Sequence, residues 1–221
     1  YGMLVNGGKK ITPTLIDRIQ DRHGKSIFKH DERDCPGCKQ ASWLKQKEPN
    51  IQDSREQVID PRVAYQVVSL LEGVVRTGTG RRIGTLKLPL AGKTGTTNES
   101  FDTWFIGFSP DLVVGVFVGF DRPRSLGYNE EGSSVGAPIF RQFMKDAFKR
   151  QPVIPFRVPS GIRLIRVNAE TGLPAKPEDK NIILEAFLPG FGPINELLVL
   201  DGLNGFLKSN GKVKRGTGGL Y

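Results

Sequence analysis

Histidine and cysteine are scarce in this chain, which limits the metal chemistry that it can carry. Its 221 residues include two histidines, His23 and His30, and two cysteines, Cys35 and Cys38. The cysteines form a Cys-x-x-Cys, which fits a local disulfide, a zinc site that takes both histidines as further ligands, or two free thiols in a loop. No βαβ pattern surrounds them, so a thioredoxin-like redox centre is not predicted. We expect no metal and no organic cofactor.

Long apolar runs are missing as well. No stretch reaches the roughly 18 apolar residues of a membrane-spanning helix, and the first residues do not form a signal peptide. The chain opens with a short apolar segment that Asn6-Gly7-Gly8 would end as the tail of a helix. We therefore interpret the chain as a piece of a longer protein, in which any membrane anchor lies upstream.

Acidic residues are fewer than basic ones, so the net charge is +9 and the sequence pI about 9.7. Such a balance is compatible with nucleic acid, anionic lipid or an anionic polymer. The lysines and arginines are scattered, however, apart from Lys212 to Arg215, and no aromatic nucleic-acid motif accompanies them. We expect a solvated basic surface and no nucleic-acid partner.

Composition divides the chain at about residue 150. Residues 1–150 carry apolar periodicity, with a hairpin predicted around Gly24 and a polar surface insertion near residues 30–57. After Pro152, prolines and glycines recur, and only Ile162 to Val167 has the pattern of a strand. We expect residues 151–221 to be an appended and partly mobile extension.

Two helices and three strands are predicted between residues 60 and 150. Asp60-Pro61 and Ala137-Pro138 are typical helix starts, and apolar stripes at helical spacing follow both. Alternation predicts a strand over residues 85–90, near a sheet edge because of Pro89. Further strands are expected over residues 104–108, with Trp104 in the core, and over residues 113–120. The short connections between them predict an antiparallel meander.

The stretch from Ala91 to Thr97 has little side-chain bulk and one lysine, Lys93. A backbone with so few side chains is typical of a place where another molecule comes close. Gly92-Lys93-Thr94 matches the end of a phosphate-binding loop, but the position of that motif's first glycine holds Lys87, and no helix is predicted to follow. A nucleotide site is therefore disfavoured.

Lys93-Thr94-Gly95 is also one of the motifs shared by penicillin-binding proteins and serine β-lactamases. Over residues 1–150, the chain resembles the transpeptidase domain of class A, bifunctional penicillin-binding proteins, and is closest to the 1A type. The resemblance rests on these segments in family order: Glu72–Val75 with Thr77–Gly80, Ala91–Asn98, Asp102–Phe108, Val118–Asp121 and Gly132–Phe140.

The resemblance implies an α+β fold, penicillin-binding/β-lactamase-like, with a mainly antiparallel central sheet flanked by helices and only part of the domain present. It implies peptidoglycan cross-linking by acyl transfer through a serine ester, with β-lactams as mimics of a stem peptide ending in D-Ala-D-Ala. Strand alternation puts Thr94 and Thr96 on one face, where their hydroxyls bind the terminal carboxylate, while Lys93 must reach round the strand to add its charge. Gly95 lets the peptide approach, and the Thr96 N–H belongs to the oxyanion hole.

The family's Ser-x-x-Lys, which supplies the nucleophile, and its Ser-x-Asn both precede Lys-Thr-Gly. We expect both to lie before Tyr1, with a glycosyltransferase domain and a membrane anchor further upstream, so the chain alone should not acylate itself. The implied location is the periplasmic face of a bacterial inner membrane, an oxidising setting that agrees with a Cys35–Cys38 disulfide. A serine β-lactamase and a non-catalytic cell-wall interaction module remain as alternatives.

Overall fold

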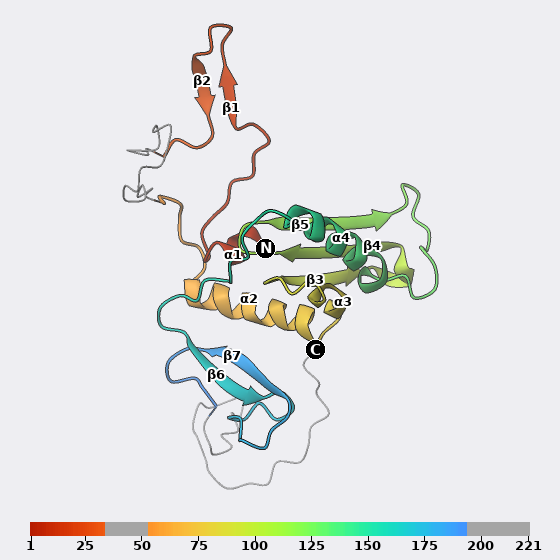
Figure 1. Cartoon of the computed structure of the whole chain (residues 1–221). Coiled ribbons are helices and arrows are strands. Elements are labelled where there is room, and N and C mark those ends of the chain that lie inside the picture. The colour runs from red at the N-terminus through yellow and green to blue at the C-terminus, as the bar shows by residue number, and fades with distance from the viewer. Residues whose placement is uncertain (34–52, 194–221) are drawn as a thin grey trace, which may run out of the picture.

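The computed structural model describes residues 1–33 and 53–193, which fold as an α+β protein with antiparallel sheets, as predicted (Figure 1). A 3-10 turn at Asn98–Ser100 and a π-helical turn at Gly132–Gly136 accompany the main elements. The helices and strands, in chain order, are α1 Gly2–Val5, β1 Arg18–Gln20, β2 Ser26–Lys29, α2 Pro61–Arg76, α3 Arg81–Gly84, β3 Ala91–Thr96, β4 Asp102–Phe108, β5 Val113–Gly119, α4 Ala137–Ala147, β6 Arg163–Asn168 and β7 Ile182–Phe187.

The central sheet is an antiparallel meander in the order β3-β4-β5, as the short connections predicted. The turn between β4 and β5 is built by Ser109, whose Oγ accepts a hydrogen bond from the Leu112 N–H at 3.1 Å. In this sheet β3 has β4 on one side, and its other edge is not paired with any described strand. That open edge carries the low-bulk sequence, so the candidate site is accessible from the side of the sheet.

Helix α2 begins at the residues that predicted it. The Asp60 carboxylate accepts a hydrogen bond from the Arg62 N–H at 2.8 Å, and Pro61 occupies the first helical position, where an N–H is not needed. The Arg62 guanidinium also holds the pKa of the Asp60 carboxyl down, at about 2. The helix contacts β3 on one side and β7 on the other (Figure 1). It therefore joins the central sheet to the C-terminal hairpin.

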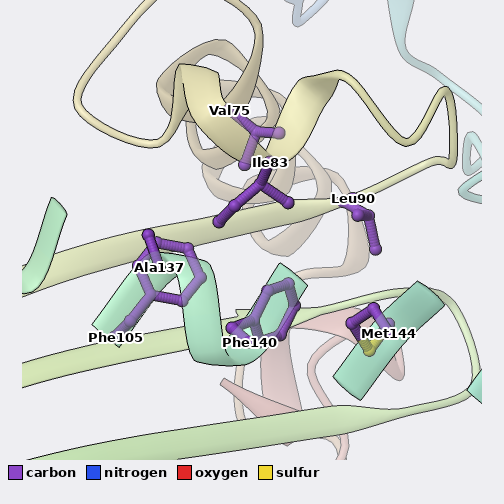
Figure 2. Close-up of a cluster of buried hydrophobic side chains, with 7 residues drawn as sticks. All are labelled: Val75, Ile83, Leu90, Phe105, Ala137, Phe140 and Met144. Carbon is purple, nitrogen blue, oxygen red and sulfur yellow. The ribbon is translucent and has the colours of Figure 1, made fainter. Parts of the chain in front are cut away.

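The main core lies between the helices and one face of the sheet (Figure 2). Phe105 of β4 and Phe140 of α4 are fully buried, and their ring centroids are 5.0 Å apart. Residues from four segments close around this pair: Val75, Ile83, Leu90, Ala137 and Met144. Because α2, α3, β4 and α4 all contribute, the position of β3 depends on packing from distant parts of the chain.

The strand predicted over residues 85–90 is wrong. Residues 81–84 form helix α3, and the chain then turns, with the Leu86 N–H bonded to the Ile83 carbonyl at 3.0 Å. Lys87 has a φ of 55°, in the left-handed region, which no strand contains. The alternating leucines reflect contact with the core from an irregular segment, since Leu86 and Leu88 pack against it and Leu90 is buried. The strand itself starts at Ala91.

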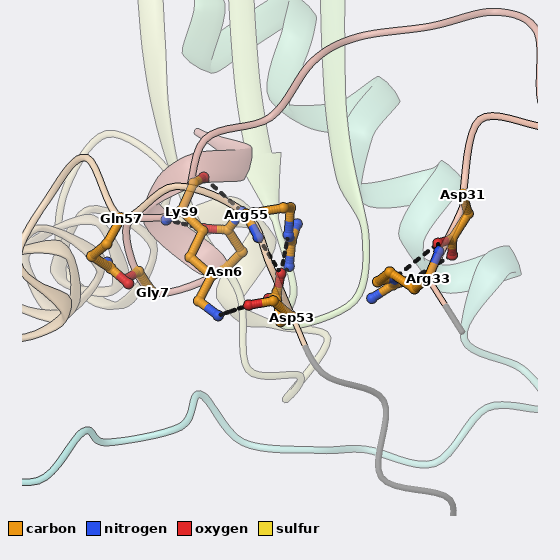
Figure 3. Close-up of polar contacts among 8 residues, drawn as sticks. All are labelled: Asn6, Gly7, Lys9, Asp31, Arg33, Asp53, Arg55 and Gln57. Atoms are coloured by element: carbon orange, nitrogen blue, oxygen red, sulfur yellow. Dashed lines mark hydrogen bonds and ion pairs between the residues drawn. The ribbon is translucent and has the colours of Figure 1, made fainter. Parts of the chain in front are cut away.

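The predicted insertion near residues 30–57 lies partly outside the described residues, together with Cys35 and Cys38, but its base is visible (Figure 3). Lys9 forms an ion pair with Asp53 at 2.9 Å. The Gln57 side-chain amide donates to the Gly7 carbonyl at 2.6 Å. These contacts hold the C-terminal end of the insertion against residues 7–9, beside the start of α2. The hairpin β1–β2, predicted around Gly24, extends away from the central sheet (Figure 1).

The C-terminal part contributes a second hairpin, β6–β7. Strand β6 was predicted, but β7 was not, because residues 175–221 showed little periodicity. The hairpin packs on α2, where the Gln66 side-chain amide donates to the Ala186 carbonyl at 2.9 Å. The division of the chain at residue 150 stays a prediction.

Candidate functional site

The two faces of β3 carry different side chains, as strand alternation requires. Residues paired across β3 and β4 share a face, so Thr94 lies beside Phe105 and Thr96 beside Thr103. Lys93 is paired with Ile106 and starts on the opposite face. The predicted arrangement of two hydroxyls on one face and the lysine on the other is therefore present in the backbone.

The Lys93 side chain reaches round the strand, as its starting position required. Its ammonium donates to the Thr94 carbonyl oxygen at 3.0 Å and contacts the Thr94 Oγ1 at 3.3 Å. Lys93 is exposed and Thr94 is partly buried. The charge therefore rests at the open edge, next to a hydroxyl, where an anionic group can meet both.

The Thr96 hydroxyl and N–H differ in what they contact. Its Oγ1 accepts a hydrogen bond from the Gly132 N–H at 3.1 Å, so its hydroxyl proton is free to be donated elsewhere. The Thr97 N–H bonds to the Asp102 carbonyl of the neighbouring strand at 3.0 Å. Because N–H groups alternate between the two edges of a strand, the Thr96 N–H points away from β4, to the open edge.

Glycine is needed at both glycine positions of β3, for different reasons. A Cβ at Gly92 would lie 2.8 Å from the Ile106 carbonyl oxygen and from the Phe105 ring, so bulk there would disrupt the sheet and the core. A Cβ at Gly95 would meet the Cβ of Trp104 at 3.3 Å, and no other atom within 4 Å. Gly95 thus leaves the backbone open to an approaching chain.

A groove of about 380 Å³ adjoins Lys93. Helix α2 and the turn after it form one side, and β7 forms the other. Its lining is Ser69, Leu70, Gly73, Val74, Arg76, Thr77, Gly78, Thr79, Lys93, Ile183, Leu184 and Glu185. Arg76 is paired with Glu72 at 3.0 Å, and burial raises the pKa of the Glu72 carboxyl while the Arg76 guanidinium acts in the opposite direction. The C-terminal hairpin thus contributes to the surface beside the candidate site.

Asp102 and Trp104 lie in β4, the strand beside β3. Asp102 is the first residue of β4, and its N–H donates to the Thr97 Oγ1 at 2.8 Å. Trp104 was expected in the core, which is wrong. It is 43% exposed and packs against Phe117, with ring centroids 4.8 Å apart, on the sheet face opposite Phe105. Alternation along β4 puts Trp104 on the outer face, and an apolar residue type alone could not decide this.

The structure also contradicts a phosphate-binding loop at Gly92-Lys93-Thr94. In such loops the lysine and the following hydroxyl residue open a helix, whose N–H groups hold the phosphate. Lys93 and Thr94 instead lie inside a strand. Within residues 1–33 and 53–193, histidine, cysteine, aspartate and glutamate form no group of three or more that could hold a metal ion.

The expectation that Ser-x-x-Lys occurs only before Tyr1 needs correction, because the spacing occurs three times in the chain. Ser26 and Lys29 both lie in β2, where residues three apart point to opposite faces. This hairpin extends away from the central sheet, to which β3 belongs (Figure 1). The other two instances, Ser42 with Lys45 and Ser209 with Lys212, fall outside the described residues. The structure therefore does not bring Ser26 and Lys29, the pair that it describes, to the open edge of β3.

Two residues that contact the site had no role predicted for them. Thr79, in the turn after α2, has its Oγ1 at 3.0 Å from the Thr94 Oγ1. Gly132 begins the π-helical turn and bonds to Thr96. Both belong to segments that carried the family resemblance, Thr77–Gly80 and Gly132–Phe140. Their contacts span 15 and 36 residues, so the sequence offered only the resemblance as a signal.

The comparison with protein families matches residues 1–145 to the penicillin binding protein transpeptidase domain. Penicillin-binding protein 1A of Rickettsia bellii is 41% identical over 207 residues, which cover 91% of this chain and 25% of that protein. The protein of the same name from Pseudomonas aeruginosa is 34% identical over 229 residues, covering 89% of this chain and 28% of its own length. The chain thus spans about a quarter of the length of these curated relatives.

A solved structure supports the same likeness. The crystal structure of penicillin-binding protein 1A from Haemophilus influenzae superposes with a TM-score of 0.68 at 28% identity, covering 87% of this chain and 31% of that one. The fold predicted from the Lys-Thr-Gly neighbourhood is confirmed by this match. No helix in the described part of the chain is long and apolar enough to cross a membrane.

Proposed function

The chain belongs to the penicillin-binding protein transpeptidase family, and from this premise we propose that it is part of a serine-type peptidoglycan D,D-transpeptidase. The observation that carries the proposal is the open edge of β3, where the Lys93 ammonium lies beside the Thr94 hydroxyl. An extended peptide adds to such an edge as a further strand. The substrate class is a stem peptide that ends in D-Ala-D-Ala, and β-lactams are its mimics.

Each site residue has a physical task in this proposal. The hydroxyls of Thr94 and Thr96 donate to the terminal carboxylate, and the Lys93 charge strengthens that contact. The Thr96 hydroxyl is suited to donation because its oxygen already accepts a hydrogen bond from the Gly132 N–H, which leaves its proton for the carboxylate. The Thr96 N–H, directed to the open edge, is one donor of the oxyanion hole, and loss of such a donor costs about 10²–10³-fold in rate. Gly95 lets the peptide backbone come close.

The nucleophile is supplied, in this proposal, by a part of the protein outside these 221 residues. The relatives are about four times longer than the matched segment, and Ser26 lies on a hairpin that extends away from the central sheet. The serine oxygen attacks the acyl carbon, the terminal D-Ala leaves with its carboxylate, and an amine from a second stem peptide then displaces the serine. A glycosyltransferase domain, a membrane anchor and a periplasmic location complete the proposal.

Labelling with a fluorescent penicillin tests the proposed function. The full-length protein, purified from the complete gene, should acquire a covalent label that excess unlabelled benzylpenicillin prevents. The label should also persist after the free drug is removed, since a transpeptidase releases the acyl group slowly. Rapid release of hydrolysed penicillin would indicate a serine β-lactamase. A full-length protein that never becomes labelled would support a non-catalytic interaction module.

A further inference from the structure

The turn after α2 is fixed tightly against the end of that helix. A Cβ at Gly78 would lie 2.9 Å from the Cα of Val74, so only glycine fits there without a shift. The Gly80 N–H donates to the Val74 carbonyl at 3.0 Å, and the Arg81 N–H donates to the Gly78 carbonyl at 3.1 Å. Thr79 lies between the two glycines. The backbone on both sides of its exposed side chain is therefore held in place.

Thr79 directs its hydroxyl at the candidate site. The Thr79 Oγ1 lies 3.0 Å from the Thr94 Oγ1, which is also 3.3 Å from the Lys93 ammonium. A threonine hydroxyl has one proton to donate and two lone pairs that accept. When Lys93 and Thr79 both donate to Thr94, its lone pairs are filled, and its single proton remains for a ligand. An ionised carboxylate only accepts hydrogen bonds, so it needs a hydroxyl that donates its proton in this way.

We propose that Thr79 is a positioning residue that commits the Thr94 hydroxyl proton to the carboxylate of the bound substrate. The inference rests on the proposed function, since it takes the ligand of Thr94 to be that carboxylate. In the empty site, either hydroxyl can donate to the other. On binding, the Thr94 proton turns to the carboxylate, and Thr79 becomes the donor. Thr79 thereby acts through Thr94 and does not touch the reacting atoms.

The same turn provides a matched control. Thr77 is two residues away and also exposed, but its Oγ1 donates to the Gly73 carbonyl at 3.2 Å, at the end of α2. Substituting valine for either threonine removes a hydroxyl and keeps the branched shape. A difference between Thr77→Val and Thr79→Val therefore reports the contact with Thr94.

The experiment measures acylation of the full-length protein by benzylpenicillin over a range of drug concentrations. Thr79→Val should raise the half-saturating concentration about fivefold, the value of one ordinary hydrogen bond, and leave the limiting rate unchanged. Thr79→Ser should behave as the wild type, and so should Thr77→Val. With the methyl ester of benzylpenicillin, which has no carboxylate, Thr79→Val should match the wild type. In a Thr94→Val background, Thr79→Val should have no further effect.

Three results would overturn the inference alone. The first is an equal change of the half-saturating concentration in Thr77→Val and Thr79→Val. The second is an equal loss for Thr79→Val with benzylpenicillin and with its methyl ester. The third is an effect of Thr79→Val that persists in full in the Thr94→Val background. A general disturbance of the turn would produce such results. A wild-type full-length protein that benzylpenicillin does not acylate would overturn the proposed function, and with it this inference.

Discussion

Lys93 and Lys87 show how little a residue type says about its task. Both are exposed lysines close together in sequence, but Lys93 lies on the open edge of β3 beside Thr94. Lys87 lies in the irregular segment before the strand, with a φ of 55°, and lines a separate cavity with residues of α2 and Pro155. Only the first is placed to meet a ligand that pairs with β3.

Removing the Lys93 charge should therefore impair acylation far more than removing the Lys87 charge. In the full-length protein, Lys93→Ala should lower the second-order rate constant for acylation by benzylpenicillin about 10- to 100-fold, the range for a lost hydrogen bond to a charged group. Lys87→Ala should change it less than about twofold. Stopped-flow quenching of the acylation step measures both. Equal effects would show that Lys93 is not the carboxylate-binding lysine.

At the residue scale, the sequence could predict the arrangement along β3 but not the contacts that hold it. Once the resemblance assigned a strand here, alternation indicated that Thr94 and Thr96 share a face and that Lys93 must reach round, and the register confirms this geometry. The bond from Gly132 to Thr96 links residues 36 apart and depends on how α4 packs, so no local pattern indicates it. The catalytic roles of these residues stay predictions.

At the element scale, capping residues and periodicity predicted α2 and α4. Of the meander, these signals located β4 and β5 but not β3. They worked where each lies within a few residues of the boundary that it determines, as with Asp60 at the start of α2. They failed at residues 85–90, where leucines alternate because the chain turns across the core. They also missed β7, which is stabilised by its neighbour β6 and by α2, far away in sequence.

Helix α4 offers a direct test of how the core supports the site. Phe140 is fully buried against Phe105, whereas Phe143 on the same helix is 49% exposed. Phe140→Ala should lower the free energy of unfolding by about 3–5 kcal/mol, because it leaves a cavity. Phe143→Ala should cost less than about 1 kcal/mol. Urea unfolding followed by circular dichroism measures both, and similar losses for the two variants would contradict the described packing.

At the scale of the whole molecule, the chain supplies one wall of the proposed site. The family match covers residues 1–145, and the C-terminal hairpin then packs on α2 beside the groove at Lys93. The recognition groups on β3 are at an open edge, accessible to a peptide. The residue that attacks the acyl carbon is, in our proposal, contributed by the remainder of the longer protein.

The 221-residue chain alone should accordingly not become labelled by fluorescent penicillin under conditions that label the full-length protein. In the full-length protein, Ser26→Ala should leave labelling unchanged, because Ser26 lies on a hairpin remote from β3. Fluorescence after denaturing electrophoresis measures both. A stable label on the isolated chain that Ser26→Ala abolishes would place the nucleophile on that hairpin.

The open edge of β3 has a consequence for solubility. A row of unpaired N–H and C=O groups that accepts a peptide accepts another protein's strand equally well, which is the usual first step of edge-to-edge aggregation. The strand is only six residues long, has two glycines and carries a charge at Lys93, and short length and lysine are features that protect exposed edges. The Lys93 charge therefore has a second effect besides ligand binding, because it disfavours pairing of the strand with another protein. A neutral residue at this position would leave the edge open to self-association.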